Sequence, residues 1–368
     1  FAGMIIGPYT PPFTLVSSLE TINLLAELGI IMLLFVVGTE FPVAKLRAVG
    51  RISLIVALAE ALGTLTIVFF IAQYLGFSFF DSIFLSLALS ITSTVVTVRV
   101  LEELGLIHDK SSLLLLGISI VEDILAISIL AILQSVAAAD AEGDGISIVS
   151  IAISIGVVGG FIGSILVIGS KYMPTIIDKV GRTNDYTLLL LVILALAFGL
   201  SFVAQGLGLS VATGAFLAGV LVAESKSASV AKIVTIPLRD MFGAIFFISI
   251  GALMDISLIP VFIVPAAILI LASFASKFLI VTGILSKAKV GNTTALRTGL
   301  GMASAKGELS LVVVKGGQDV GAITNSILPI LGVVTIVTTF ITPFIIRLGA
   351  KLNLSEAAED SPSHLPQE

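Results

Sequence analysis

Hydrophobic residues follow one another in long blocks of about twenty positions, and short polar stretches separate the blocks. A helix needs about 20 apolar residues to cross a bilayer, whereas a transmembrane strand would alternate over about ten. The pattern therefore predicts eleven membrane-spanning helices, and the apolar residues 1–8 predict the end of a further one. The predicted spans cover residues 20–38, 52–75, 80–104, 113–138, 146–170, 186–204, 208–223, 239–257, 258–286, 294–317 and 324–348.

The composition agrees with this pattern and excludes several classes of protein. Hydrophobic residues make up 57% of the chain and charged residues 12%, against about 25% charged residues in a soluble protein. We therefore expect an all-α polytopic membrane protein that is surrounded by lipid. The absence of cysteine excludes disulfides and thiol chemistry, and with two histidines in the chain we expect no histidine metal site. A net charge of −5 without a basic block predicts no nucleic-acid partner.

Basic residues lie mainly at one side of the predicted membrane. If span 20–38 ends in the cytoplasm, sixteen of the 19 Lys and Arg residues fall on that side, and Lys315 alone falls on the other. Such an excess indicates the cytoplasmic face and predicts a cytoplasmic C-terminus. The polar tail, 355–368, is expected to be cytoplasmic and disordered.

Ionisable residues inside the spans point to function, because each costs about 2.5–3.5 kcal/mol to insert at mid-membrane. Glu122 and Asp123 are adjacent carboxylates that can hold either a proton or a cation, although a structural ion pair is the alternative. Lys277 lies in mid-span, and Glu122 is its expected counter-charge, with backbone carbonyls as the alternative. Glu60 has no evident partner and is a candidate residue of the ion path.

Two spans contain sequences that interrupt a helix. Residues 90–97 bring five hydroxyl side chains into mid-membrane, and residues 301–310 bring two charges and two glycines to a similar depth. Unwound backbone is tolerated there only where it is buried in protein or lines a cavity. Interrupted helices in matching positions of two halves indicate the binding site of a secondary transporter.

Other sequence features give weaker evidence about packing and function. The glycines of span 146–170 have the spacing of a close helix contact, with a dimer interface as the alternative, and they are Gly156, Gly159, Gly160 and Gly163. Glu27 and Glu40 are expected near the membrane surfaces. No P-loop, dinucleotide-binding turn or catalytic triad is present, so we expect neither an enzyme nor a bound cofactor.

Several of these stretches together resemble one family, the monovalent cation:proton antiporters, in the branch of the Kef-type and bacterial sodium/proton exchangers. The resemblance covers nearly the whole chain. It rests on AGMIIGP at 2–8, LAELG and LFVVGTE at 25–40, Ser93-Thr94 with RVL at 99–101, GAFLAG at 214–219 and FFISIG at 246–251.

The resemblance implies a fold with an inverted repeat and about thirteen helices, of which the first and part of the second are missing here. It implies a core with two crossed broken helices and a separate dimerisation scaffold. The antiporter domain would cover 1–354, with the core near 80–138 and 239–317 and the scaffold in the remaining helices. The expected setting is a homodimer in the inner cell membrane.

The resemblance also assigns roles to single residues. Asp123 would carry the cation and the proton, Glu122 would occupy the neighbouring position, and Lys277 would be the charge partner of Glu122. Glutamate is not the commonest residue at position 122, which leaves the charge stoichiometry open. The remaining site residues would be the ligands Thr92, Ser93, Thr94 and Ser119, and Lys306 and Glu308 in the second broken helix.

The function implied is exchange of a monovalent cation for protons by alternating access, with Na⁺ favoured and Li⁺ or K⁺ as other substrates. Asp123 would bind the cation or the proton, never both. The alternatives are a Kef-type K⁺/H⁺ efflux antiporter, a Na⁺-coupled symporter and a membrane sensor that transports nothing. A cation channel would need a repeated carbonyl filter, and no such sequence is present.

Overall fold

The computed structural model describes residues 2–9, 16, 18–40, 50–141, 148–183, 185–207, 209–254 and 259–359, and this part of the chain is helical, without strands. The helices are α1 (Ala2–Ile6), α2 (Leu19–Thr39), α4 (Arg51–Tyr74), α5 (Phe79–Ser90), α6 (Thr94–Glu103), α7 (Lys110–Ala141), α8 (Ile148–Ser164), η1 (Ile165–Gly169), α9 (Ser170–Gly181), α10 (Tyr186–Gly206), α11 (Val211–Ala223), α12 (Ala228–Ala252), α13 (Ile259–Lys287), α14 (Asn292–Ser304), α15 (Glu308–Asp319) and α16 (Ile327–Glu359).

The predicted all-α membrane fold is confirmed. Eight helical segments of the described chain are long and apolar enough to cross a membrane. The two spans expected to be interrupted each consist of two short helices, α5 with α6 and α14 with α15. Their breaks fall at residues 91–93 and 305–307, inside the runs rich in hydroxyls, charges and glycine.

The structure differs from the predicted boundaries in three places. Span 146–170 continues to Gly181, through the π-helical turn η1 and then α9. Helix α12 begins at Ala228 and contains Pro237, so the proline does not end it. Helix α16 reaches Glu359, which makes the first five residues of the expected tail helical. Residues 360–368, Lys45, Arg47 and most of the acidic loop at 140–145 lie outside the described residues.

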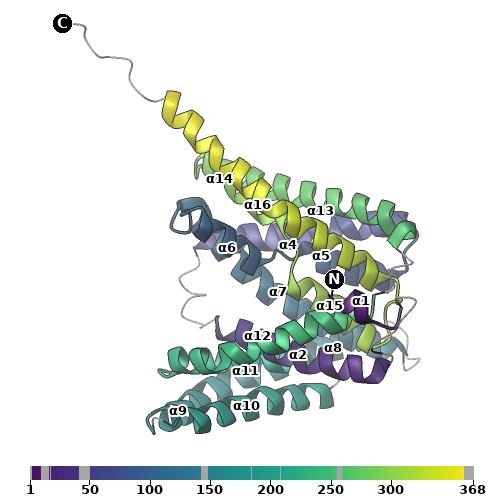
Figure 1. Cartoon of the computed structure of the whole chain (residues 1–368), viewed down its shortest axis with the longest axis vertical. Helices are drawn as coiled ribbons and strands as arrows, with labels where there is room; N and C mark the ends of the chain where they lie inside the picture. Colours follow the sequence, from purple (N-terminus) through teal and green to yellow (C-terminus); the bar gives the residue numbers. More distant parts are fainter. Residues whose placement is uncertain are drawn as a thin grey trace, which may run out of the picture.

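The helices form two groups along the long axis of the molecule (Figure 1). One group contains α2, α9, α10, α11 and α12, in which α2 packs against both α11 and α12. The other contains α4, α7, α13 and α16 with the broken helices α5–α6 and α14–α15, and α13 packs against both α4 and α14. We call the first group the scaffold and the second the core. By packing, helix α12 lies with the scaffold, and α4 and α16 lie with the core. The predicted transport core at 80–138 and 239–317 stays a prediction.

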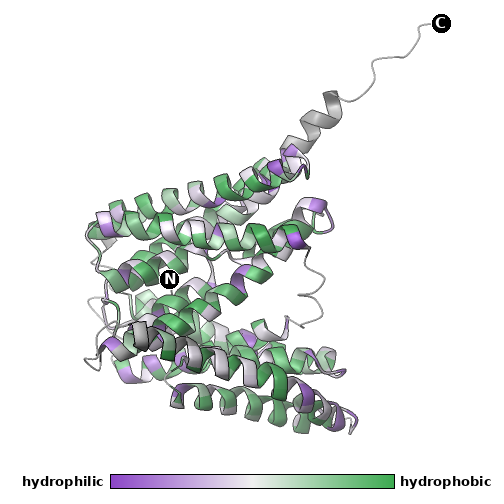
Figure 2. Cartoon of the chain, turned by 180° about the vertical axis from the view of Figure 1, so that it is seen from behind, coloured by the Kyte–Doolittle hydropathy of each residue, from purple (hydrophilic) through white to green (hydrophobic). Residues whose placement is uncertain are grey.

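The outer surface is apolar, as a lipid environment requires. Figure 2 shows hydrophobic residues along the lengths of both groups of helices, with hydrophilic residues gathered at helix ends. Large side chains such as Phe202, Phe340 and Val167 are among the most exposed. The four glycines of α8 have no atom within 4 Å of the position that a Cβ would take, so they make no tight contact within the described chain.

Glycines bring scaffold helices α2 and α11 into backbone contact. A Cβ on Gly219 would overlap the carbonyl oxygen of Phe35, and a Cβ on Gly38 would overlap that of Phe216. Both obstacles are backbone atoms, which cannot rotate away as a side chain can. The close approach therefore depends on glycine at both positions.

We expect Gly219→Ala to lower stability by about 1–3 kcal/mol, because the added methyl group forces α2 and α11 apart. The matched control is Gly283→Ala in α13, where the Cβ would meet nothing within 4 Å and alanine favours the helix. Size-exclusion chromatography of heated, detergent-solubilised protein measures both. Equal melting temperatures for the two variants would contradict the proposed contact.

Candidate ion-binding site

The two breaks cross, and partners from each other and from α16 satisfy their polar groups. The backbone N–H of Ser93 donates to the carbonyl of Ala305 at 2.9 Å. The hydroxyl of Thr92 donates to the carbonyl of Met302 at 2.8 Å. The backbone N–H of Lys306 donates to the hydroxyl of Thr338 on α16 at 3.2 Å. Because these groups lie at membrane depth, the partners replace hydrogen bonds that water makes elsewhere.

Four helix ends meet at this crossing, and charged residues lie at two of them. The C-terminal end of a helix carries partial negative charge and the N-terminal end partial positive charge. The Lys306 ammonium is buried and donates to the carbonyl of Leu89, in the last turn of α5, at 2.6 Å. Glu308 occupies the first turn of α15. Both charges therefore have the sign that stabilises the nearby helix end.

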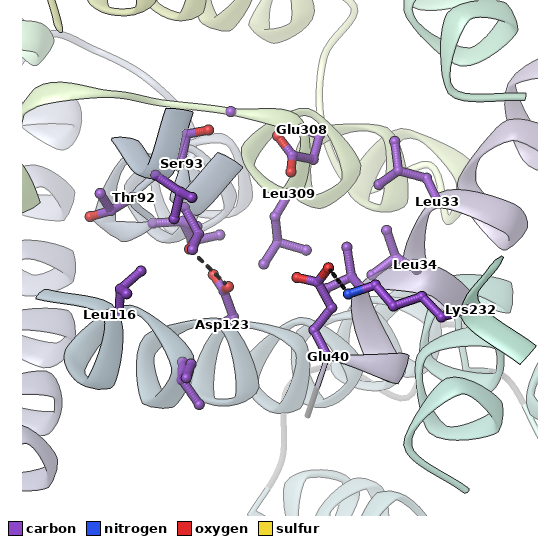
Figure 3. Close-up of a pocket in the computed structure, with 16 residues that line it drawn as sticks. Leu33, Leu34, Glu40, Thr92, Ser93, Leu116, Asp123, Lys232, Glu308 and Leu309 are labelled. Atoms are coloured by element: carbon purple, nitrogen blue, oxygen red, sulfur yellow. Dashed lines mark hydrogen bonds and ion pairs between the residues drawn. The ribbon is translucent and has the colours of Figure 1, made fainter. Parts of the chain in front are cut away.

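Asp123 lies on α7 opposite the crossing and faces a cavity of about 290 Å³ (Figure 3). Its side chain is nearly buried, and Thr94 donates to its Oδ2 atom at 3.4 Å. The core side of the cavity includes Asp123 and Glu308, and the scaffold side is formed by α2 and α12. The lining residues are Leu33, Leu34, Val37, Glu40, Ile91, Thr92, Ser93, Thr94, Val98, Leu116, Ile120, Asp123, Lys232, Gly307, Glu308 and Leu309.

Lys277 on α13 lies deeper, between two carboxylates. Its ammonium pairs with Glu122 on α7 and with Oε1 of Glu60 on α4, the latter at 3.0 Å. It also donates to the hydroxyl of Thr92 at 2.8 Å. All three charged side chains are at most 1% exposed. One buried ammonium thus joins α4, α7 and α13 to the break in α5–α6.

Other predicted site residues have different surroundings. Glu60 pairs with Lys277, accepts a hydrogen bond from Thr64 and does not line this cavity, so its place on the ion path stays a prediction. The hydroxyl of Ser119 donates to the sulfur of Met302 at 3.4 Å, and Ser119 is fully buried away from the cavity. Lys306 also lies outside this cavity, whereas Thr92, Ser93, Thr94 and Glu308 line it.

The sequence did not indicate that Glu40 and Lys232 belong to the cavity. Their side chains form an ion pair of 2.9 Å between α2 and α12. The sequence predicts only that Glu40 lies near a membrane surface. Because 192 positions separate Glu40 from Lys232, no local spacing indicates that they form a pair.

The cavity offers the donor set of a hard cation. Asp123 supplies a carboxylate, and Thr92, Ser93 and Thr94 at the break in α5–α6 supply hydroxyl oxygens on the cavity. Oxygen ligands of this kind bind Na⁺, Li⁺ and K⁺, and protonation of the carboxylate removes the charge that attracts the ion. The arrangement therefore suits a site where a cation and a proton compete.

This fold and site are those of a transporter with crossed broken helices, and the comparisons identify its family. The family model for the transmembrane sodium/hydrogen exchanger matches residues 1–350, so the chain belongs to that family. The predicted relationship to cation/proton antiporters is confirmed.

Individual relatives agree with this family. The chain is 36% identical over 278 residues to a putative cation/proton antiporter, YbaL, of Escherichia coli, covering 74% of this chain and 49% of that protein. It is 31% identical to the high-affinity Na⁺/H⁺ antiporter NhaS3 of Synechocystis, covering 94% of this chain and 75% of that protein. The chain thus spans about half the length of the first relative and three quarters of the second.

A solved structure shares the fold. The sodium proton antiporter MjNhaP1 from Methanocaldococcus jannaschii, in a structure at pH 8, superimposes with a TM-score of 0.65 at 19% identity. The match covers 97% of this chain and 89% of that one.

We expect Lys277→Gln to destabilise the protein by about 3–5 kcal/mol, because it leaves buried carboxylates without their cation. Adding Glu122→Gln should restore part of the loss, and adding Glu60→Gln as well should restore more. Lys287→Gln, at the exposed end of α13, is the matched control and should have little effect. Thermal unfolding of the four variants tests this, and a Lys277→Gln protein as stable as wild type would refute the pairing.

Proposed function

We propose that this chain is the antiporter domain of a transporter that exchanges a monovalent cation, preferentially Na⁺, for protons. The observation that carries the proposal is the position of Asp123, a nearly buried carboxylate on a cavity beside two crossed helix breaks. The descriptions of relatives from Synechocystis and Methanocaldococcus jannaschii as sodium/proton antiporters support it.

Competition for one carboxylate couples the two fluxes. Ionised Asp123 binds the cation, with Thr92, Ser93 and Thr94 as further ligands, and a proton that binds Asp123 displaces the cation. A bare carboxylate is costly to carry through an apolar barrier, whereas the occupied site is neutralised. Movement of the core against the scaffold would then expose the occupied site to alternate faces of the membrane.

Lys277 has a supporting role in this proposal. Glu60 and Glu122 hold its ammonium from two sides, which keeps the charge fixed close to the break in α5–α6. A fixed charge organises the ligands of Asp123 without taking part in each cycle. Currents measured on a solid-supported membrane test this, because a lysine that released its proton in each cycle would change the charge moved per cation.

The choice of cation is the main alternative within this function. A relative described as a K⁺/H⁺ antiporter subunit, KhtU of Bacillus subtilis, is 24% identical over 95% of this chain. Dequenching of a pH-sensitive dye in proteoliposomes, with Na⁺, Li⁺ or K⁺ added in turn, ranks the substrates. Solute uptake driven by Na⁺ would indicate a symporter, and no flux with any cation would indicate a sensor.

We also propose a cellular location, an orientation and an oligomeric state for the transporter. The transporter lies in the inner membrane as a homodimer, with its C-terminus in the cytoplasm. The basic residues on one side of the spans support the orientation. The glycine-rich face of α8, which makes no tight contact within the described chain, is the candidate dimer surface.

We expect Asp123→Asn to abolish cation-driven proton flux, because an amide neither releases a proton nor attracts the cation by charge. Asp240→Asn is the matched control, since Asp240 is exposed and pairs with its neighbour Arg239. Dye dequenching in proteoliposomes measures both variants at equal protein content. Activity above a few per cent of wild type in folded Asp123→Asn protein would disprove the central role of Asp123.

We expect Thr94→Val to raise the KM for the cation several-fold while it changes the maximal rate less, because it removes a ligand hydroxyl beside Asp123 and preserves shape. Thr66→Val is the control, because the hydroxyl of Thr66 bonds its own helix on an exposed face of α4. Cation titrations of proton flux supply both constants. An unchanged KM for every cation tested would place the ligands elsewhere.

A further inference from the structure

The scaffold contributes one pair of opposite charges to the cavity. Among the described residues that line the cavity, Glu40, Asp123 and Glu308 are acidic and Lys232 is basic. Figure 3 shows Glu40 and Lys232 joined to each other on the side of the cavity opposite Thr92 and Ser93. The pair therefore belongs to the same cavity as Asp123, although neither residue belongs to the crossing.

The pair lies closer to water than Asp123 does. The side chains of Lys232 and Glu40 are 40% and 44% exposed, whereas Asp123 is 7% exposed. Glu40 directly follows α2, and Lys232 lies in the first two turns of α12, so both are at helix ends. A cation that moves from solvent to Asp123 through this cavity therefore passes the pair.

The pair is also loosely held. Ion pairs between half-exposed side chains contribute little net stability, since solvent screens them and long side chains lose freedom. Among the described residues, Lys232 forms an ion pair with Glu40 and with no other side chain. Its ammonium can leave Glu40 at little cost, and a monovalent cation from solvent carries the same charge.

We propose that Lys232 sets the cation affinity of this transporter as a tethered competitor at the mouth of the cavity. When it pairs with Glu40, its positive charge occupies the place where an arriving cation would be attracted and lowers the cation concentration near Asp123. Clefts lined by one sign of charge concentrate counter-ions, and a lysine in such a cleft reduces that effect. The inference rests on the proposed exchange function and adds a residue that controls its affinity.

The proposal predicts opposite effects for the two partners. Lys232→Gln should lower the KM for the transported cation by about two- to fivefold, which corresponds to about 0.4–1 kcal/mol. Glu40→Gln should raise the KM, because it removes an attractive charge and frees the ammonium of Lys232. The double variant should lie between the two.

The experiment measures proton flux in proteoliposomes against Na⁺ concentration, at low and at high choline chloride. The effect of Lys232→Gln should shrink at high salt, because the Debye length falls to about 10 Å at 0.1 M and shorter above it. Lys232→Arg keeps the charge and should keep the wild-type KM. Lys226→Gln removes an equal charge from an exposed residue outside the cavity and is the matched control.

The outcomes separate this inference from the proposed function. If wild type shows no cation-driven proton flux, the antiporter function itself fails. If wild type exchanges but Lys232→Gln and Lys226→Gln have the same KM, the role of Lys232 is refuted. A Lys232→Arg protein whose KM falls as far as that of Lys232→Gln would also refute it, because the effect would then depend on shape and not on charge.

Discussion

The structure depends on one constraint, which is that two interrupted helices inside the membrane must satisfy each other's backbone. Each break exposes N–H and C=O groups that lipid cannot satisfy. The crossing solves this with bonds between distant segments, from Ser93 to Ala305, from Thr92 to Met302 and from Lys306 to Thr338. These bonds hold the α5–α6 break against the α14–α15 break and α16 at the centre of the core.

The same constraint determines where charge can be placed. Lys306 meets the C-terminal carbonyls of α5, and Glu308 lies in the first turn of α15, so the helix ends stabilise both. Lys277 is enclosed by two carboxylates. Within the described chain, Asp123 is left with one long hydrogen bond from Thr94 and an open cavity before it. A buried carboxylate with so few partners favours any ligand that neutralises it, and a proton and a small cation both do so.

Much of the fold could be predicted from the sequence, because lipid imposes a simple rule on helix length and polarity. The spans followed from apolar runs of about twenty residues, and the two breaks followed from hydroxyls, glycines and charges at mid-span. The sequence does not predict which helices pack together, because the apolar residues on one helix face do not specify the helix that covers it. The packing of α12 with the scaffold helices, and of α4 and α16 with the core helices, is therefore seen only in the structure.

The candidate site shows the same limit at the level of single residues. The sequence predicts the pair of Glu122 and Lys277 because each buried charge needs a counter-charge. That rule does not say how many carboxylates contact one lysine. No local pattern around Glu60 indicates its contact with Lys277, which lies 217 positions further along the chain. The pair of Glu40 and Lys232 depends likewise on the contact of α2 with α12.

The division into scaffold and core explains why the cavity lies where it does. Gly38 and Gly219 allow backbone contact between α2 and α11, and α2 also packs closely against α12 within the scaffold. Asp123 and the crossing belong to the core, which its own buried charges hold together. The cavity forms where these two groups face each other, so the proposed shift between them would change access to Asp123 without breaking the contacts inside either group.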